Sequence, residues 1–142
     1  MKPVNLIAVF AENKLGQMAR ITQVLVEAGI NIRWITFATS ERFGVIKVLV
    51  DQTGPACRAL QQQGWTVSLV EVLAVEVPDK PGGLHTVVDC LTRHRINIEN
   101  ASGFVANKRA VALIEVKDLA PARRILAKEK LPLLSQKDML RL

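Results

Sequence analysis

Aromatic residues are scarce in this chain. There is no tyrosine, and four phenylalanines and two tryptophans make up 4% of the 142 residues. Proteins that bind single-stranded nucleic acid without sequence preference stack bases on aromatic side chains. The composition therefore offers few stacking platforms, and nucleic acid is not the expected partner.

Cysteine and long apolar runs are also scarce. Cys57 and Cys90 are the only cysteines and lie far apart, which excludes a disulfide scaffold and a CxxC metal or redox pair. They are expected to be buried thiols in a reducing compartment, so we expect a cytoplasmic protein. No apolar run approaches the roughly 20 residues that span a bilayer, and the N-terminus lacks a signal-peptide pattern.

Metal and catalytic constellations are equally absent. His85 and His94 stand nine residues apart with no further ligands at metal-binding spacing. No serine–histidine–acid set, phosphate-cradling loop or spaced carboxylate pair is present. We therefore expect no metal, no cofactor and no catalysis.

Positive charge is in excess, but it is evenly spread. The net charge of +6 divides equally between the two halves of the chain. The densest basic cluster comprises Arg123, Arg124, Lys128 and Lys130, which recur at helical spacing. Such a cluster is typical of a solvated helix face, and the alternative is a phosphate-binding surface.

The chain repeats itself. A shift of 66 positions pairs residues 4–70 with 70–136 without a gap, and 15 of the 67 pairs are identical. The densest match joins Gly29-Ile30-Asn31-Ile32 to Arg95-Ile96-Asn97-Ile98. Self-similarity at this level indicates a duplication.

Each copy contains the same series of elements. Residues 4–11 are rich in β-formers, and Met18, Ile21, Leu25 and Ala28 recur at helical spacing until Gly29 stops the helix. The first copy continues with strands at 30–39 and 43–51, a helix after Gly54-Pro55 and a strand at 65–69. The second copy has strands at 70–77, 96–105 and 108–116, helices at 82–94 and 120–130, and a weak strand at 131–135.

This order predicts an α+β fold of two tandem ferredoxin-like βαββαβ units, over residues 1–69 and 70–142. Their antiparallel sheets would carry helices on one face, and pairing of sheet edges between the copies would hide open strand edges. Because Leu69 runs straight into Val70 without a linker, we expect one rigid body. Boundaries near residue 70 follow from the repeat.

The first and third strands of both copies are apolar on both faces, although helices can cover only one. We expect a homodimer or a higher even oligomer formed through the helix-free faces. Val9 and Val75 are expected on those faces, so aspartate at either position should cause dissociation or aggregation.

At this level of detail the sequence resembles the ACT domain. The resemblance rests on Asn13-Lys-Leu-Gly16-Gln-Met18, a helix and Gly29-Ile-Asn31-Ile32, and on Asp79-Lys-Pro-Gly82-Gly-Leu84, a helix and Ile96-Asn97-Ile98. It covers nearly the entire chain, which looks like the small stand-alone proteins built of two ACT domains, and the second copy is the closer match to the motif. The resemblance implies a regulator of amino-acid metabolism, with second strands paired edge to edge into one eight-stranded sheet and an amino acid bound near the loop before the first helix.

The chemistry of that loop suits a zwitterion. Glycines let the backbone approach a ligand, and the first N–H groups of the helix favour a carboxylate. Asn13 and Asp79 could accept from an ammonium, and the amides of Asn31 and Asn97 could donate and accept. The predicted ligand-binding residues are Asn13, Leu15, Gly16, Gln17, Met18, Asn31, Ile32, Asp79, Pro81, Gly82, Gly83, Leu84, His85, Asn97 and Ile98.

Structural roles remain open for these residues. Asn13 and Asp79 could cap the following helix, and Asn31 and Asn97 could be turn residues. If they do bind ligand, two quasi-equivalent sites would form where the repeats meet. The Asp79 loop would bind more tightly, because it offers a full charge to the ammonium.

Two other functions remain open. The chain could be a regulatory subunit that docks on a biosynthetic enzyme without a ligand of its own. The same element order also builds the RNA-recognition module, and Arg42-Phe43-Gly44-Val45 resembles its third-strand motif. The second copy has Lys108-Arg109-Ala110-Val111 there, without an aromatic residue, which disfavours RNA.

Overall fold

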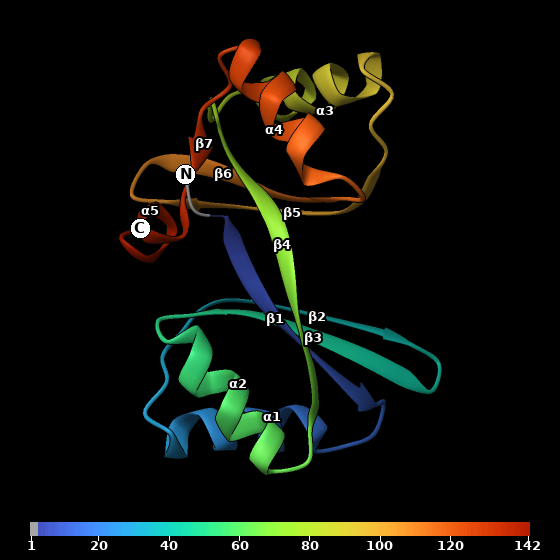
Figure 1. The fold of residues 1–142 in the computed structure, drawn as a ribbon, viewed down its shortest axis with the longest axis vertical. Coiled ribbons are helices and arrows are strands. Elements are labelled where there is room, and N and C mark those ends of the chain that lie inside the picture. Colours follow the sequence, from blue (N-terminus) through green and yellow to red (C-terminus); the bar gives the residue numbers. More distant parts are fainter. Residues whose placement is uncertain (1–2) are drawn as a thin grey trace. The chain divides into compact units, whose positions relative to one another are not determined.

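A computed structural model describes residues 3–142 and divides them into two compact units. The N-terminal unit comprises Asn5–Val70. The C-terminal unit comprises Glu71–Leu142 together with Pro3 and Val4. Each unit is a sheet with a pair of long helices packed on it, as the ribbon shows (Figure 1).

The N-terminal unit contains strands β1 (Val4–Glu12), β2 (Ile32–Ser40) and β3 (Phe43–Val50), and helices α1 (Gln17–Glu27) and α2 (Thr53–Gln62). Strand β1 pairs antiparallel with β3, and β3 pairs antiparallel with β2. Strand β4 (Thr66–Val77) is the other neighbour of β1. The resulting order β4-β1-β3-β2 is that of the predicted ferredoxin-like unit.

The C-terminal unit repeats this plan. It contains β5 (Ile98–Ala106), β6 (Arg109–Val116), β7 (Leu133–Leu134), α3 (Gly83–Arg93), α4 (Leu119–Lys128) and α5 (Gln136–Leu140). Here β4 is the first strand, and it pairs antiparallel with β6 and β7 while β6 pairs with β5. The order β7-β4-β6-β5 again matches the predicted fold.

Seven strands are present in residues 3–142 where eight were expected. The two strands predicted at 65–69 and 70–77 form one strand, β4, which leaves one unit and enters the other between Val70 and Glu71. Residues 66–77 contain no glycine or proline, so nothing interrupts the extended chain. The second strands β2 and β5 share no hydrogen bonds in these residues, contrary to the expected edge-to-edge pairing.

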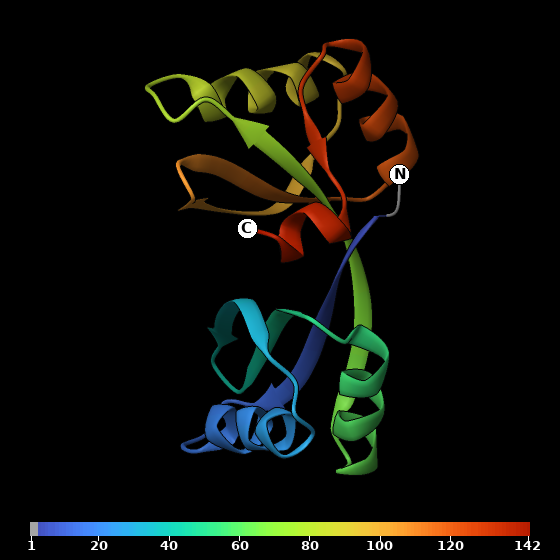
Figure 2. The ribbon, with the colours of Figure 1, turned by 90° about the vertical axis from the view of Figure 1, so that its left-hand side faces the viewer.

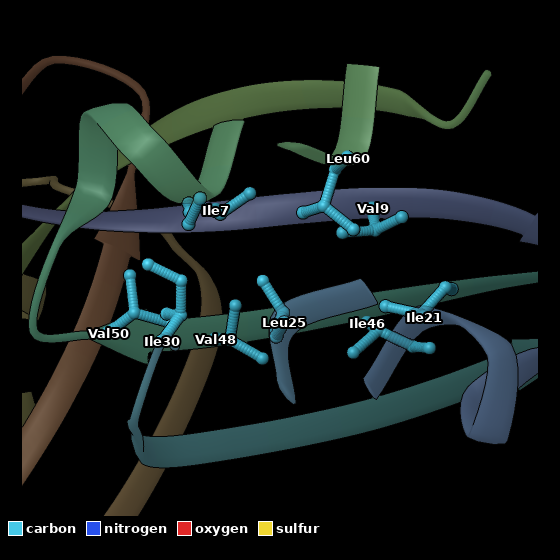
Figure 3. Close-up of a cluster of buried hydrophobic side chains, with 10 residues drawn as sticks. Ile7, Val9, Ile21, Leu25, Ile30, Ile46, Val48, Val50 and Leu60 are labelled. Carbon is cyan, nitrogen blue, oxygen red and sulfur yellow. The ribbon is translucent and has the colours of Figure 1, made fainter. Parts of the chain in front are cut away.

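The two cores are built from equivalent positions. A cluster of ten buried residues, drawn in Figure 3, fills the N-terminal unit. A shift of 66 positions turns it into the C-terminal cluster, except that Ile30 has no buried counterpart there and Cys90 joins instead. The duplication inferred from sequence is therefore also a duplication of packing.

All four long helices end in the same hydrogen-bonding motif. In each, the third residue beyond the helix donates its N–H to the carbonyl five positions earlier, which satisfies a free carbonyl of the last turn. The bonds run from Ile30 to Leu25, Trp65 to Leu60, Ile96 to Leu91 and Leu131 to Leu126. Gly29 and Gly64 take the positive φ this motif needs, but Arg95 and Lys130 stand there in the second copy at φ 58° and 57°.

One prediction about strand faces is wrong. Val9 and Val75 are fully buried in the two core clusters, among residues of the helices. The face opposite these clusters, called here the open face, carries Leu6, Ala8 and Phe10 on β1 instead, and of these only Phe10 is exposed. Because β1 is apolar on both sides, its alternation could not show which side meets the helices.

The C-terminal helix α5 was not expected. It begins with a capping box, in which Ser135 Oγ accepts from the Asp138 N–H and the Asp138 carboxylate accepts from the Ser135 N–H. Figures 1 and 2 both place α5 on the side of the β5–β6 sheet away from α3 and α4. Met139 of α5 is buried. The open face of the C-terminal unit is therefore partly covered by the chain itself.

Candidate functional site

The loops before α1 and α3 are shaped by glycine. Gly16 and Gly82 are the residues immediately before the two helices, each with φ of 89°. This left-handed conformation favours glycine because a Cβ would be strained there. Neither Asn13 nor Asp79 caps its helix with its side chain. The first N–H groups of α1 and α3, from Gln17 and Gly83, donate instead to the carbonyls of Lys14 and Lys80 in the same loops.

Gly83 has a structural role. A Cβ at this buried residue would collide with the carbonyl oxygen of Pro78 in the same loop. The close backbone approach expected for a ligand is thus made by the protein's own chain. The N–H of Gly83 also donates to the carbonyl of Lys80, at 3.1 Å. This loop is tightly closed.

The two acidic or amide candidates of these loops differ. Asn13 donates from Nδ2 to the carbonyl of Glu41, at 3.0 Å, and from its N–H to the carbonyl of Arg42, at 2.7 Å. It ties the loop to the turn between β2 and β3. Asp79 is exposed, and residues 3–142 give its carboxylate no hydrogen bond or ion pair. Of the two, only Asp79 is free to meet a ligand charge.

The other predicted residues of the loops are mostly solvent-facing. Leu15 is fully exposed and Leu84 about half exposed. Met18 packs against the core, and Gln17 accepts a hydrogen bond from Arg20. Pro81 and His85 are exposed. Apart from Met18, these side chains are open to a ligand or a partner.

The second-strand candidates lie at the other end of the first helix of each unit. Gly82 precedes α3 and Asn97 follows it, and an 11-residue helix is roughly 16 Å long. A free amino acid cannot reach both. A glycine loop and the asparagine of the same unit therefore do not belong to one amino-acid site. Ile32 and Ile98 pack partly against the two cores.

Asn31 is held by a carboxylate. Its N–H donates to Asp51 Oδ1 at 3.0 Å, and the Asp51 N–H donates back to the Asn31 carbonyl at 3.2 Å. The counterpart of Asp51 in the second copy is Lys117. The two quasi-equivalent positions, Asp51 and Lys117, therefore differ in charge. In residues 3–142 no side chain accepts a hydrogen bond from the Asn97 N–H as Asp51 does from the Asn31 N–H.

Asn97 lines two adjoining cavities of the C-terminal unit. One, of about 430 Å³, lies between α3 and the start of β5 and is also lined by Val88, Thr92 and Ile98. The other, of about 320 Å³, is lined by Arg95, Ile96, Asn97, Glu99, Lys117, Asp118 and Pro121. We call the second one the Asn97 pocket.

Charges of both signs converge on the Asn97 pocket. Lys117 and Arg95 supply cations, and Glu99 and Asp118 supply carboxylates. Asp118 is the residue before α4, where aspartate normally accepts a capping hydrogen bond, yet its side chain makes none. Its carboxylate is therefore available to a ligand ammonium.

Of the seven residues that line the Asn97 pocket, only Asn97 is among the ligand-binding residues predicted from the sequence. Antiparallel pairing of Ile98 with Val116 brings the start of β5 beside the end of β6, so Asn97 and Lys117 meet at one edge. The available signal was the polar pair Lys117-Asp118 directly after an apolar strand.

Shifted pKa values mark structural contacts elsewhere. The hydrogen bond from Arg109 lowers the pKa of the Glu76 carboxyl, and the backbone N–H of Ser135 lowers the pKa of Asp138. Burial raises the pKa of the Cys57 and Cys90 thiols, so neither is primed as a nucleophile. In residues 3–142 no three His, Cys, Asp or Glu side chains gather as a metal site would require.

Comparison with known families settles the resemblance. A model of the ACT domain pair matches residues 2–142. The chain belongs to this family. As an ACT domain pair it has a βαββαβ order in each half, as predicted, and ACT domains are regulatory modules.

Solved structures share this fold. Protein BT0572 from Bacteroides thetaiotaomicron is 26% identical, with a TM-score of 0.92 over 99% of this chain and 97% of that one. The regulatory subunit of aspartate kinase from Thermus thermophilus is 18% identical, with a TM-score of 0.61 over 87% and 91%. The corresponding subunit from Thermus flavus is 18% identical, with a TM-score of 0.60 over 90% and 93%.

Comparison with curated proteins gave no match. None of the helices in residues 3–142 of this ACT domain pair has the length and apolar character to cross a membrane.

Proposed function

We propose that this ACT domain pair is a non-catalytic, cytoplasmic regulatory protein that binds a free amino acid in the Asn97 pocket. The observation that carries the proposal is the convergence of two cationic and two acidic side chains around an amide. A zwitterion needs donors for its carboxylate and acceptors for its ammonium within a few ångströms, and this pocket supplies both.

The roles follow from the chemistry of each group. Lys117 and the Asn97 amide donate to the carboxylate, while Asp118 accepts from the ammonium through a charge-assisted bond. Ile96 and Pro121 give the ligand side chain an apolar wall. Glycine loops of another unit or copy, at Gly16 or Gly82-Gly83, are the proposed second half of the site.

Regulation of an enzyme of amino-acid metabolism is the proposed output. Similar structures include regulatory subunits of aspartate kinase, and these support the fold-level analogy. A ligand that binds one conformation of the loops more tightly than another would increase the population of that conformation, and the regulated enzyme would contact it.

The test is a thermal-shift screen of the twenty amino acids followed by calorimetric titration of those that raise the melting temperature. A ligand that binds only the folded state must stabilise it. We expect one amino acid, or a few related ones, to bind below millimolar concentration. Lys117→Met and Asp118→Asn should each weaken that binding about tenfold or more, as loss of a charged hydrogen bond implies.

Asp89→Asn is the matched control. Asp89 lies on α3 in the same unit and pairs with Arg93 outside the pocket, so its loss should leave the affinity unchanged. If no amino acid binds, the sensor function is wrong and the ligand-independent docking subunit takes its place. If the control weakens binding as much as Asp118→Asn, the assigned pocket is wrong.

A further inference from the structure

A groove of the N-terminal unit lies on its helices, which are side by side on the sheet (Figures 1 and 2). Its volume is about 560 Å³, against about 320 Å³ for the Asn97 pocket. Residues of α1 form one wall, and two residues that follow α2 form the other. The walls include Arg20, Gln23, Val24, Glu27, Gln63 and Trp65. We call it the Trp65 groove.

Two of the lining residues are apolar and half-buried. Trp65 and Val24 both pack against the core of the N-terminal unit, and each leaves part of its side chain at the surface. In residues 3–142 the indole N–H of Trp65 makes no hydrogen bond, although a buried indole usually has a partner. An apolar side chain on the ring and a carbonyl oxygen at the indole N–H would satisfy both parts of this residue.

A cation and a carboxylate lie along the α1 wall. Arg20 and Glu27 are seven positions apart, which separates them by about 10 Å along the helix axis. Both are exposed, and in residues 3–142 neither forms an ion pair. Arg20 donates from Nη1 to Gln17 Oε1 at 3.2 Å, and Glu27 Oε1 accepts from Gln23 Nε2 at 3.1 Å. The wall therefore offers one charge of each sign to an occupant.

The equivalent surface of the second copy is different. A shift of 66 positions takes Trp65 to Leu131, so the aromatic ring is absent there. The same shift takes Glu27 to Arg93, which forms an ion pair with Asp89 on its own helix at 3.0 Å. The features of the Trp65 groove therefore belong to the first copy alone, and the duplicated fold does not require them.

We propose that the Trp65 groove binds an extended segment of a partner protein, in which an acidic and a basic residue stand three positions apart with an apolar residue between them. Three residues of extended chain span about 10 Å, which matches the spacing of Arg20 and Glu27. The acidic side chain pairs with Arg20 and the basic one with Glu27. The apolar side chain covers Trp65.

Two glutamines favour an extended segment over a helix. In residues 3–142 the Gln63 side chain makes no hydrogen bond, and Gln23 uses only its Nε2 group. Polar groups that a partner covers need hydrogen bonds from that partner. An extended chain has free backbone N–H and C=O groups, whereas a helix bonds its own. A helix could therefore satisfy these glutamines only through side chains.

The test is selection of peptides on the full chain. A phage-displayed library of random peptides is selected on the natural protein, and enriched sequences are synthesised and titrated by fluorescence anisotropy. We expect them to share the acidic, apolar and basic pattern. Arg20→Glu should raise their dissociation constants at least about tenfold, because an attractive contact becomes repulsive. Arg58→Glu is the matched control, since Arg58 on α2 is also exposed but does not line the groove.

A second selection tests the charge pattern. On Glu27→Arg the same library should enrich peptides with two acidic residues at that spacing, whereas Glu41→Arg, an equal charge change at an exposed turn, should enrich the original pattern. Trp65→Leu introduces the residue of the second copy and should weaken all the peptides without loss of the fold, which circular dichroism checks.

Several results would overturn the proposal. These are enrichment of no common pattern, unchanged affinity in Trp65→Leu, or an equal effect of a control and its partner variant. A change in the sedimentation of the chain alone in Arg20→Glu would make the groove a contact between copies, which also overturns it. Amino-acid binding in the Asn97 pocket is measured with other variants and does not depend on this outcome.

Discussion

Arg109 on β6 donates two parallel hydrogen bonds to the carboxylate of Glu76 on β4, from Nε to Oε1 and from Nη2 to Oε2, each 2.8 Å long. The planar guanidinium matches the carboxylate in this bidentate geometry, which is stronger than a single-bonded pair. The two side chains occupy the positions that Phe10 and Phe43 occupy in the first copy. The same pair of sheet positions is therefore an ion pair in the second copy and two exposed aromatic side chains in the first.

The Glu76–Arg109 pair should make stability depend on acid. The hydrogen bond from Arg109 holds the pKa of Glu76 below its usual 4.5 in the folded state. A carboxyl whose pKa is lower in the folded than in the unfolded protein stabilises the fold at a pH above its unfolded-state pKa. This stabilisation is lost as the pH falls through the folded-state pKa. The free energy of unfolding should therefore decline below about pH 4.5. Urea titrations at several pH values measure it.

Glu76→Gln should be less stable than the natural protein at pH 7 and should show a shallower decline below pH 4.5. Glu99→Gln is the control, since Glu99 has no ion pair within residues 3–142. Equal pH dependence of Glu76→Gln and the natural protein would show that the pair is energetically silent.

Lys130 tests the helix-end motif. It has φ of 57° just beyond α4, where the first copy has Gly64. A side chain in this conformation costs roughly 1–2 kcal/mol, partly offset by the greater unfolded-state freedom of glycine. Lys130→Gly should therefore stabilise the protein by up to about 1 kcal/mol. Lys128→Gly, within the last turn of α4, should instead destabilise it by about 1 kcal/mol. Chemical denaturation compares the two.

Gly83→Ala probes the closed loop before α3. The added Cβ collides with the backbone oxygen of Pro78, which cannot move like a flexible side chain. We expect a loss of about 1–3 kcal/mol, typical of forcing a methyl group into a filled space. Leu84→Ala, at an exposed neighbour, should change stability by less than about 0.5 kcal/mol. Similar losses in both variants would show that the approach to Pro78 is not the cause.

The fold could be predicted from the sequence where the same hydrophobic pattern occurs in both copies. Ile21 and Leu25 recur as Val87 and Leu91, and both pairs are core residues. Helix α5 was missed because five residues give too little periodicity, although Ser135 and Asp138 have the capping-box spacing. Two strands became one in β4 because the boundary between copies carries no turn residue.

The candidate site was less predictable because it depends on which elements meet. Asn97 was singled out by the repeat, but Lys117 and Asp118 join it only through the pairing of β5 with β6. Gly83 lies in a glycine-rich loop of the kind that admits a ligand, but the group that comes close to it is the backbone of Pro78 in the same loop. Glycine that shapes a loop and glycine that admits a ligand look the same in one sequence.

Leu60 and Leu126 occupy equivalent positions on α2 and α4, and both are fully buried. Replacing either with alanine should cost about 2–5 kcal/mol. Both tryptophans, Trp34 and Trp65, belong to the N-terminal unit, so their fluorescence reports on that unit alone. Because β4 runs through both repeats without a linker, we expect both variants to lower the fluorescence and circular-dichroism midpoints equally. An unchanged fluorescence midpoint in Leu126→Ala would mean that the units unfold separately.

Asp79 offers the most specific test of the glycine loops. Its carboxylate has no partner in residues 3–142, whereas the counterpart Asn13 already donates to Glu41. If the loop supplies half of an amino-acid site, Asp79 accepts from the ligand ammonium. Asp79→Ala should then weaken binding by about 1–3 kcal/mol, the loss expected for a charge-assisted hydrogen bond.

Asn97→Ala should also weaken binding, and Asn13→Ala should weaken it less than Asp79→Ala. Calorimetric titration with the amino acid identified by thermal shift measures all three. Asp79→Ala with unchanged affinity, beside an effect of Asn97→Ala, would confine the site to the Asn97 pocket and exclude the Asp79 loop.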